Sequence, residues 1–198
     1  MAMASTEAPK TPAVAVFCAA RHGGQAAHTQ AAQDLGRGLA ELGLHLVYGG
    51  GKMGLMGELA DTMLAGGGTI TGVIPDFLRA RELAHLGVSD MVITPNMHRR
   101  KQIMLERADA VVMLPGGLGT LDETIEVLTW RTLQLHHKPI YLCNIAGAAR
   151  GILGAIEAAI EDGFAGPEVR KHYQVHTSIL DLLEALKLLQ NSHGDLEV

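Results

Sequence analysis

Short apolar runs alternate with amphipathic segments along most of this chain, and that alternation limits the folds it can adopt. The apolar runs are continuous, which is typical of strands covered on both faces. They occupy residues 13–19, 45–48, 69–74, 91–93, 110–114 and 139–142. Helices are expected at residues 29–42, 54–64, 97–107, 121–135, 148–161 and 179–189. Strands that alternate with helices predict an α/β fold, a doubly wound and mostly parallel sheet with helices on both faces.

Length and composition favour one globular unit and argue against several functional classes. With 198 residues, 47% of them hydrophobic, we expect a single domain at residues 13–190 between disordered tails at 1–12 and 191–198. A net charge of −5 and 4% aromatic residues argue against nucleic acid or an anionic membrane as a partner. No apolar stretch reaches the roughly 20 residues of a membrane helix, and no leader-like segment opens the chain, so we expect a cytoplasmic protein.

The cysteines and histidines form no pattern typical of a metal site. Cys18 and Cys143 lie in apolar runs without a Cys-x-x-Cys motif, which predicts two buried thiols in a reducing compartment. His136 and His137 precede Pro139 and are expected in a polar loop. There is no His-Glu-x-x-His motif. We therefore expect no bound metal.

Residues 48–57, the first glycine loop, read Tyr-Gly-Gly-Gly-Lys-Met-Gly-Leu-Met-Gly and follow a predicted strand. Glycines at such a position permit positive φ and let backbone amides face an anion. The candidates for a phosphate or nucleotide loop are Gly49, Gly50, Gly51 and Gly54. Gly49, Gly51 and Gly54 form a Gly-x-Gly-x-x-Gly pattern, and Asp76 follows the next strand, where a ribose-binding acid lies in dinucleotide folds. Because the pattern follows the second strand and not the first, a tight turn with close helix–sheet packing is the favoured interpretation.

Residues 115–120, the second glycine loop, read Pro-Gly-Gly-Leu-Gly-Thr and lie between a predicted strand and a predicted helix. Three glycines and a hydroxyl at the start of a helix predict a phosphate cradle. No Gly-Lys-Ser/Thr follows, which argues against an ATPase. The following helix is expected to bury an apolar stripe. The stripe consists of Leu121, Ile125, Leu128 and Leu135.

Glu123 has two interpretations. The spacing Thr120-x-x-Glu123 is that of a capping box, in which the carboxylate accepts a hydrogen bond from the N-cap amide, and spacing alone favours this role. A carboxylate in the first helical turn beside an anion-binding loop is also placed to act on a bound sugar. Both interpretations stay open at the level of the residues.

A basic cluster, His-Arg-Arg-Lys, opens another predicted helix. At about 100° per residue, Arg100 and Lys101 flank the apolar stripe of this helix, whereas Arg99 lies on the opposite side. An inward-facing arginine needs an anionic partner. For Arg100, a phosphate, Glu82 or Glu123 would serve.

Together these motifs resemble those of the LOG ("lonely guy") family of cytokinin riboside 5′-monophosphate phosphoribohydrolases, long labelled lysine decarboxylases. The family pattern P-G-G-x-G-T-x-x-E matches residues 115–123, M-H-x-R-K-x-x-M matches 97–104, and Y-G-G-G-x-x-G-L-M-G matches 48–57. The resemblance covers about residues 14–189. It implies a Rossmann-like fold, a homodimer, and hydrolysis of a purine (cytokinin-type) nucleoside 5′-monophosphate to free base and ribose 5-phosphate, with no cofactor.

The resemblance also assigns roles to particular residues. Arg100 and Glu123 correspond to the residues that catalysis requires in the family. The expected substrate-binding residues are Glu82, Met97, Lys101, Gly116, Gly117, Leu118, Gly119, Thr120, Leu121, Asp122 and Thr129. Two segments depart from the family pattern: Cys-Ala-Ala at residues 18–20 replaces Cys-Gly-Ser, and Arg-Thr-Leu-Gln at 131–134 replaces the commoner Gln-Leu-Gly. These departures bear on base preference.

Three alternatives accompany this reading. A non-catalytic carrier of the same fold, similar to the molybdenum-cofactor carriers, would bind a phosphorylated ligand without cleaving it. An NAD-dependent enzyme would use the first glycine loop. A decarboxylase would need pyridoxal phosphate on a lysine, and no motif surrounds the three candidates, Lys52, Lys101 and Lys138.

Overall fold

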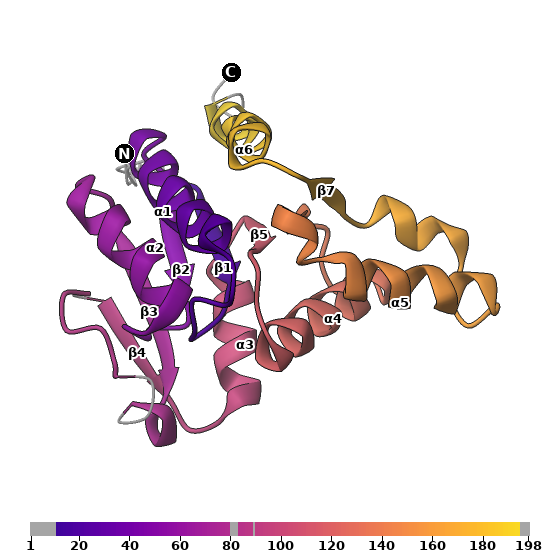
Figure 1. Ribbon diagram of the computed structural model, residues 1–198, viewed down its shortest axis with the longest axis horizontal. Helices are drawn as coiled ribbons and strands as arrows, with labels where there is room; N and C mark the ends of the chain where they lie inside the picture. The colour runs from indigo at the N-terminus through magenta and orange to yellow at the C-terminus, as the bar shows by residue number, and fades with distance from the viewer. Residues whose placement is uncertain (1–10, 80–82, 89, 195–198) are drawn as a thin grey trace, which may run out of the picture.

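The computed structural model describes residues 11–79, 83–88 and 90–194 and contains a seven-stranded sheet, shown in Figure 1. The strands are β1 Ala13–Phe17, β2 His45–Tyr48, β3 Ile70–Pro75, β4 Asp90–Thr94, β5 Ala110–Met113, β6 Ile140–Cys143 and β7 Gln174–His176. Their order is β4-β3-β2-β1-β5-β6-β7, and every neighbouring pair is parallel. The predicted α/β, doubly wound architecture is therefore confirmed.

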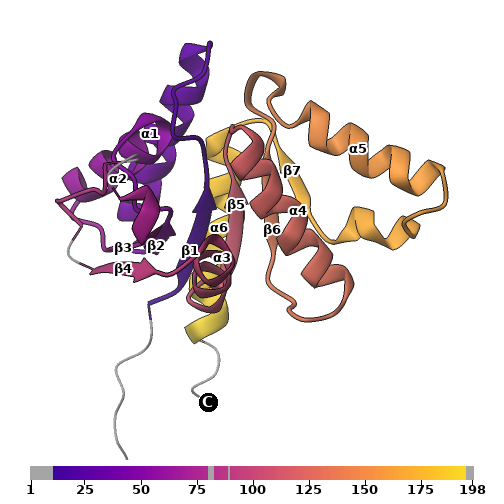
Figure 2. The ribbon, with the colours of Figure 1, turned by 90° about the horizontal axis from the view of Figure 1, so that it is seen from below.

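Helices follow most of the strands. They are α1 Ala26–Glu41, α2 Gly54–Ala65, α3 Met97–Glu106, α4 Leu118–Thr132, α5 Arg150–Glu161 and α6 Ile179–Gly194, with short 3-10 turns η1 Asp76–Leu78, η2 Ile145–Gly147 and η3 Pro167–Lys171. In both views α1 and α2 lie side by side on one part of the molecule, and α4 and α5 lie on another (Figures 1 and 2). No helix within the described residues is long and apolar enough to cross a membrane.

The central strand β1 explains why its sequence is apolar at every position. Val14 and Val16 pack with α1, α2 and α6 on one face, whereas Ala15 and Phe17 pack with α3, α4 and α5 on the other. Each of these four side chains is at most 1% exposed. Because successive side chains of a strand point to opposite faces, only a strand between two apolar layers is apolar throughout.

Most boundaries differ from the sequence prediction by one to three residues, and three larger or more consequential differences stand out. Strand β7 was missed because Gln174–His176 is short and largely exposed, so it carries no apolar run. Helix α6 continues to Gly194, past the predicted start of the tail at Asn191. Helix α4 begins at Leu118, before the predicted start at Leu121, and this difference matters for the site.

The strand order reverses at β1, which places the ends of two strands around one crevice. β1 pairs with β2 on one side and with β5 on the other, so the connections after β1 and β5 leave in opposite directions. Ligands of doubly wound sheets bind at such a reversal, beyond the carboxyl ends of the strands. The amide N–H of Ala19 donates to the carbonyl of Pro115 (3.3 Å) and ties the two connections together.

Candidate active site

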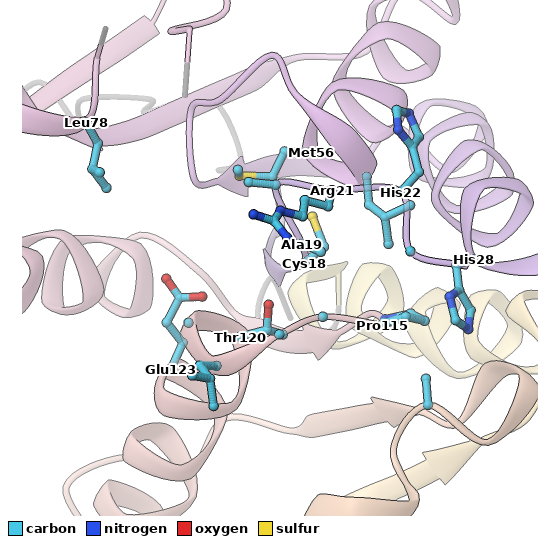
Figure 3. A pocket seen from close by; sticks show the side chains of 18 of the residues that line it. Cys18, Ala19, Arg21, His22, His28, Met56, Leu78, Pro115, Thr120 and Glu123 are labelled. Atoms are coloured by element: carbon cyan, nitrogen blue, oxygen red, sulfur yellow. The ribbon is translucent and has the colours of Figure 1, made fainter. Parts of the chain in front are cut away.

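A cavity of about 790 Å³ lies at this strand reversal (Figure 3). The connection after β1 contributes residues 18–23, and α2 contributes Leu55 and Met56. The connection after β5 contributes residues 115–117, and the first turn of α4 contributes residues 118–120. Its polar wall holds Arg100 and Glu123. The structure therefore gathers the two predicted catalytic residues and the second glycine loop around one space.

The second glycine loop faces this cavity with exposed backbone. Gly117 is the N-cap of α4 and makes no side-chain cap, so the first amides of the helix keep their hydrogen-bonding capacity. No atom lies within 4 Å of the position that a Cβ would take at Gly117 or Gly119. Gly116 differs, because a Cβ there would lie 2.1 Å from Oγ1 of Thr120. The loop combines free amides, open space and the positive end of a helix, which suits an anion.

The capping interpretation of Glu123 is wrong. Because α4 begins at Leu118, Thr120 lies inside the helix and is not its N-cap. The Glu123 carboxylate instead lies 3.5 Å from the guanidinium of Arg100, measured from Oε1 to Nη1. Both side chains are at most 7% exposed. Figure 3 shows the carboxylate pointing into the cavity.

Arg100 faces inward, as its helical position predicts. Its Nε donates to the carbonyl of Val73 (3.0 Å), and its Nη2 donates to the carbonyl of Gly49 (3.1 Å). These two bonds fix the guanidinium against the ends of β3 and β2, with Nη1 toward Glu123. Arg99 lies on the exposed side of α3, where it contacts Glu106. The predicted division of this basic cluster is confirmed.

Some of the other residues expected to bind substrate do not line this cavity. Met97 lines the cavity with the second glycine loop, but Leu121, Asp122 and Thr129 do not. The Thr129 hydroxyl donates to a carbonyl of its own helix, on the exposed face of α4. Glu82 lies outside the described residues.

Lys101 is held by two carboxylates of α4 and does not line the cavity. Its Nζ lies 3.0 Å from Asp122 Oδ2 and 2.6 Å from Glu126 Oε2. Burial lowers the pKa of Lys101, but the bonds to Glu126 and Asp122 outweigh burial and leave this pKa above its ordinary value. The lysine therefore stays charged and joins α3 to α4.

The first glycine loop packs against protein atoms. A Cβ at Gly49 would lie 2.1 Å from Nη2 of Arg100, and one at Gly57 would lie 2.0 Å from the carbonyl oxygen of Lys52. Gly50 and Gly54 have φ of +75° and +58°. Close packing accounts for the glycines at these positions, as the favoured interpretation requires. Neither these four residues nor Gly51 lines the cavity.

The dinucleotide alternative loses its ribose-binding candidate. Asp76 is exposed and pairs with Arg79 at 3.1 Å. It does not line the cavity.

Several lining residues were not predicted. Arg21, His22, Leu78 and Ala148 come from connections without a motif, and His28 comes from the start of α1. Figure 3 shows the Arg21 side chain reaching into the cavity. Spacing could not identify these residues, because only the folded connections bring them together. The departure from Cys-Gly-Ser at residues 18–20 was the one signal in that segment.

The lysines that pyridoxal phosphate would require lie away from this cavity. Lys52 lines a separate cavity of about 440 Å³, and the Lys138 ammonium donates to backbone carbonyls of Leu105 and Ala108. Lys101 is ion-paired as described above. None of the three is placed to hold pyridoxal phosphate there. Among the described residues no cluster of three or more His, Cys, Asp or Glu side chains could hold a metal ion.

Comparison with known proteins identifies the family. The family model described as "Possible lysine decarboxylase" matches residues 56–186. A cytokinin riboside 5′-monophosphate phosphoribohydrolase of Rhodococcoides fascians is 43% identical over 185 residues, which is 92% of this chain and 93% of the relative. The chain belongs to the LOG family. A LOG phosphoribohydrolase of Arabidopsis thaliana is 40% identical over 167 residues, 84% of this chain and 78% of that protein.

Solved structures share the fold at lower identity. The molybdenum cofactor carrier protein of Chlamydomonas reinhardtii aligns with a TM-score of 0.70 at 21% identity, over 92% of this chain and 99% of that chain. The molybdenum cofactor binding protein of Rippkaea orientalis aligns with a TM-score of 0.69 at 19% identity and the same coverage. At these identities the likeness establishes the Rossmann-like fold and nothing about the ligand of this LOG protein.

Proposed function

We propose that this LOG protein hydrolyses the N-glycosidic bond of a purine, cytokinin-type nucleoside 5′-monophosphate and releases free base and ribose 5-phosphate. The buried Arg100–Glu123 pair beside the open second glycine loop carries the proposal, because one cavity then offers a carboxylate and an anion site. The relatives named above carry this activity in their names.

The second glycine loop would bind the 5′-phosphate. The first amides of α4 and its positive end favour a phosphate next to Gly117 and Gly119, where side chains leave room. Binding energy from this remote group would hold the sugar against Glu123. Thr120 is buried in the same wall and adds a hydroxyl.

Glu123 would act at the anomeric carbon. Cleavage of the bond to the base develops positive charge on the sugar ring, and a carboxylate stabilises that charge or removes a proton from attacking water. Water then supplies the hydroxyl of ribose 5-phosphate, and the base leaves with a proton. Arg100, fixed by the carbonyls of Val73 and Gly49, would orient Glu123 and contact the nucleotide.

The test is a chromatographic assay for free base, with AMP and isopentenyladenosine monophosphate as parallel substrates. Glu123→Gln keeps the shape of the side chain and removes its charge, so turnover should fall at least about 100-fold. Glu157→Gln is the matched control, because Glu157 pairs with Arg170 on an exposed surface. Near-normal turnover by Glu123→Gln would refute the role of the carboxylate. The ratio of the two wild-type rates identifies the preferred base.

The carrier alternative predicts another outcome of the same assay. A carrier would bind AMP or another phosphorylated ligand tightly and release no base from either nucleotide. Base release that depends on Glu123 excludes it.

The same proposal includes a homodimer. α4 and the turn after it expose apolar side chains that a monomer would leave in water: Leu118, Ile125, Leu133 and Leu135 are 87%, 43%, 62% and 69% exposed. The predicted buried stripe of α4 is therefore wrong at Ile125 and Leu135; Thr124, Val127 and Leu128 face the core instead. A second copy on this face would also cover Thr129. Light scattering after gel filtration should give a molar mass of two chains for the wild type and of one chain for Leu133→Glu.

We place the protein in the cytoplasm. Cys18 and Cys143 are both buried thiols outside any disulfide, which suits a reducing compartment. The hydrolase domain of this proposal spans residues 13–190.

A further inference from the structure

The backbone around Arg21 is fixed, although its side chain is exposed. The amide N–H of Ala19 donates to the carbonyl of Pro115 (3.3 Å), and the carbonyl of Ala19 accepts from the amide of Met56 (3.2 Å). Gly54 packs so closely against this connection that a Cβ on Gly54 would lie 2.2 Å from the backbone nitrogen of Arg21. The connection that carries Arg21 is thus tied to both the second glycine loop and α2.

The guanidinium of Arg21 is available to a ligand. It reaches into the cavity from the wall across from Thr120 (Figure 3), and it forms no ion pair with any residue that the structure describes. The two predicted cations are committed elsewhere. Arg100 contacts Glu123 and two backbone carbonyls, and Lys101 is held by the carboxylates of α4.

A phosphomonoester carries more negative charge than the N-terminus of α4 offsets. Its charge approaches −2 at neutral pH, whereas a helix N-terminus acts as roughly half of one positive charge. Arginine binds phosphate through two parallel hydrogen bonds. Ala19 and Ala20 offer no side-chain donor on this connection, whereas the next residue, Arg21, offers several N–H donors.

We propose that Arg21 binds the 5′-phosphate of the substrate from the side opposite the second glycine loop. This inference rests on the proposed function, in which that loop holds the phosphate. Arg21 would anchor the remote end of the nucleotide and take no part in cleavage of the glycosidic bond. Its loss should therefore weaken binding and leave the bound substrate as reactive as before.

The experiment is calorimetric titration with ribose 5-phosphate, which contains the phosphate and the sugar but no bond to cleave. Arg21→Ala should raise the Kd at least about tenfold, and Arg21→Lys should recover part of the loss. Arg37→Ala removes the same charge from the exposed surface of α1, where Arg37 pairs with Asp34, and should leave the Kd unchanged. In the base-release assay, Arg21→Ala should raise the KM for AMP by the same factor, with kcat within about twofold.

Two results would overturn the proposal. One is an Arg21→Ala protein that binds ribose 5-phosphate as tightly as the wild type. The other is an equal loss of turnover on AMP and on adenosine, which would show a general structural role. Failure of the proposed function looks different, because a wild type that releases no base from any nucleotide still gives a Kd for ribose 5-phosphate. That Kd and its response to Arg21→Ala decide the role of Arg21 independently.

Discussion

The two glycine loops of this protein are alike in sequence and differ in their surroundings. Both follow a parallel strand and lead into a helix of the same sheet. In the first loop, the Cβ positions of Gly49, Gly54 and Gly57 are already occupied by protein atoms. In the second loop, the Cβ positions of Gly117 and Gly119 are open. A glycine-rich turn therefore indicates that another group comes close to the backbone. That group can belong to the protein or to a ligand, and only the folded structure distinguishes the two.

The difference also links the loops. The carbonyl of Gly49 accepts a hydrogen bond from Arg100, and the absence of a Cβ at Gly49 lets the guanidinium come that close. Arg100 then reaches Glu123 on α4, directly after the second loop. The first loop thus helps to fix the arginine that contacts Glu123 after the second loop.

The largest effect on stability is expected from Gly54→Ala. Gly54 has φ of +58°, and a Cβ there would lie 2.2 Å from the backbone nitrogen of Arg21, so the substitution should lower the free energy of unfolding by about 3 kcal/mol or more. Urea denaturation measures it. Gly67→Ala is the matched control, because Gly67 has φ of +74° with nothing within 4 Å, and it should cost only about 1–2 kcal/mol. Equal losses in the two variants would mean that the close packing of the first loop contributes nothing.

Gly119→Ala should separate binding from stability. Gly119 lies in the first turn of α4 with open space beyond it, so the protein should be as stable as the wild type or up to about 1 kcal/mol more stable. The added methyl group faces the phosphate site and should raise the KM for AMP roughly tenfold. Gly151→Ala in α5, also open, gives the stability change without the binding change. An unchanged KM would place the phosphate elsewhere.

The smallest expected effect is on the free energy of unfolding at acidic pH, and it involves His136, which packs against the C-terminal half of α4. His136 Nε2 donates to the carbonyl of Val127 (3.0 Å), and Nδ1 accepts from the amide of Lys138 (3.2 Å), so the folded state uses the neutral ring. Burial lowers the pKa of His136 below its ordinary 6.5. As the pH falls below about 6.5, the unfolded chain takes up this proton before the folded one does, and the free energy of unfolding decreases.

The wild type should lose free energy of unfolding between pH 7 and pH 5, and His136→Gln should reduce that loss by on the order of 1 kcal/mol at most. Urea titrations at several pH values measure it. His137→Gln changes the exposed neighbour and should leave the loss as in the wild type. A similar reduction in both variants would contradict the role of the buried ring.

Sequence patterns predicted most of the sheet, all but strand β7, and the two walls of the candidate site that carry motifs. Continuous apolar runs predicted six of the seven strands, because a buried parallel strand shows its pattern locally. Helical spacing also placed Arg100 inside and Arg99 outside. Local spacing failed for Glu123, since a capping box and an early helix start at Leu118 have the same sequence and differ only in where the chain enters the helix.

The third wall could not be predicted in this way. Arg21 precedes α1, and His28 lies in its first turn. Both reach the cavity only because β1 lies beside β5 in the folded sheet. Substrate binding by Lys101 stays a prediction. Its helical position points inward, but the carboxylates of Asp122 and Glu126 on a second helix hold it away from the cavity.

The central claim is that the open loop at the start of α4 binds the phosphate that positions a nucleotide against Glu123. The most direct test compares kcat/KM for AMP and for adenosine in the wild-type protein. AMP should be cleaved at least about 100-fold more efficiently than adenosine, because only the nucleotide gains the phosphate contacts. Equal efficiency for the two substrates would contradict it.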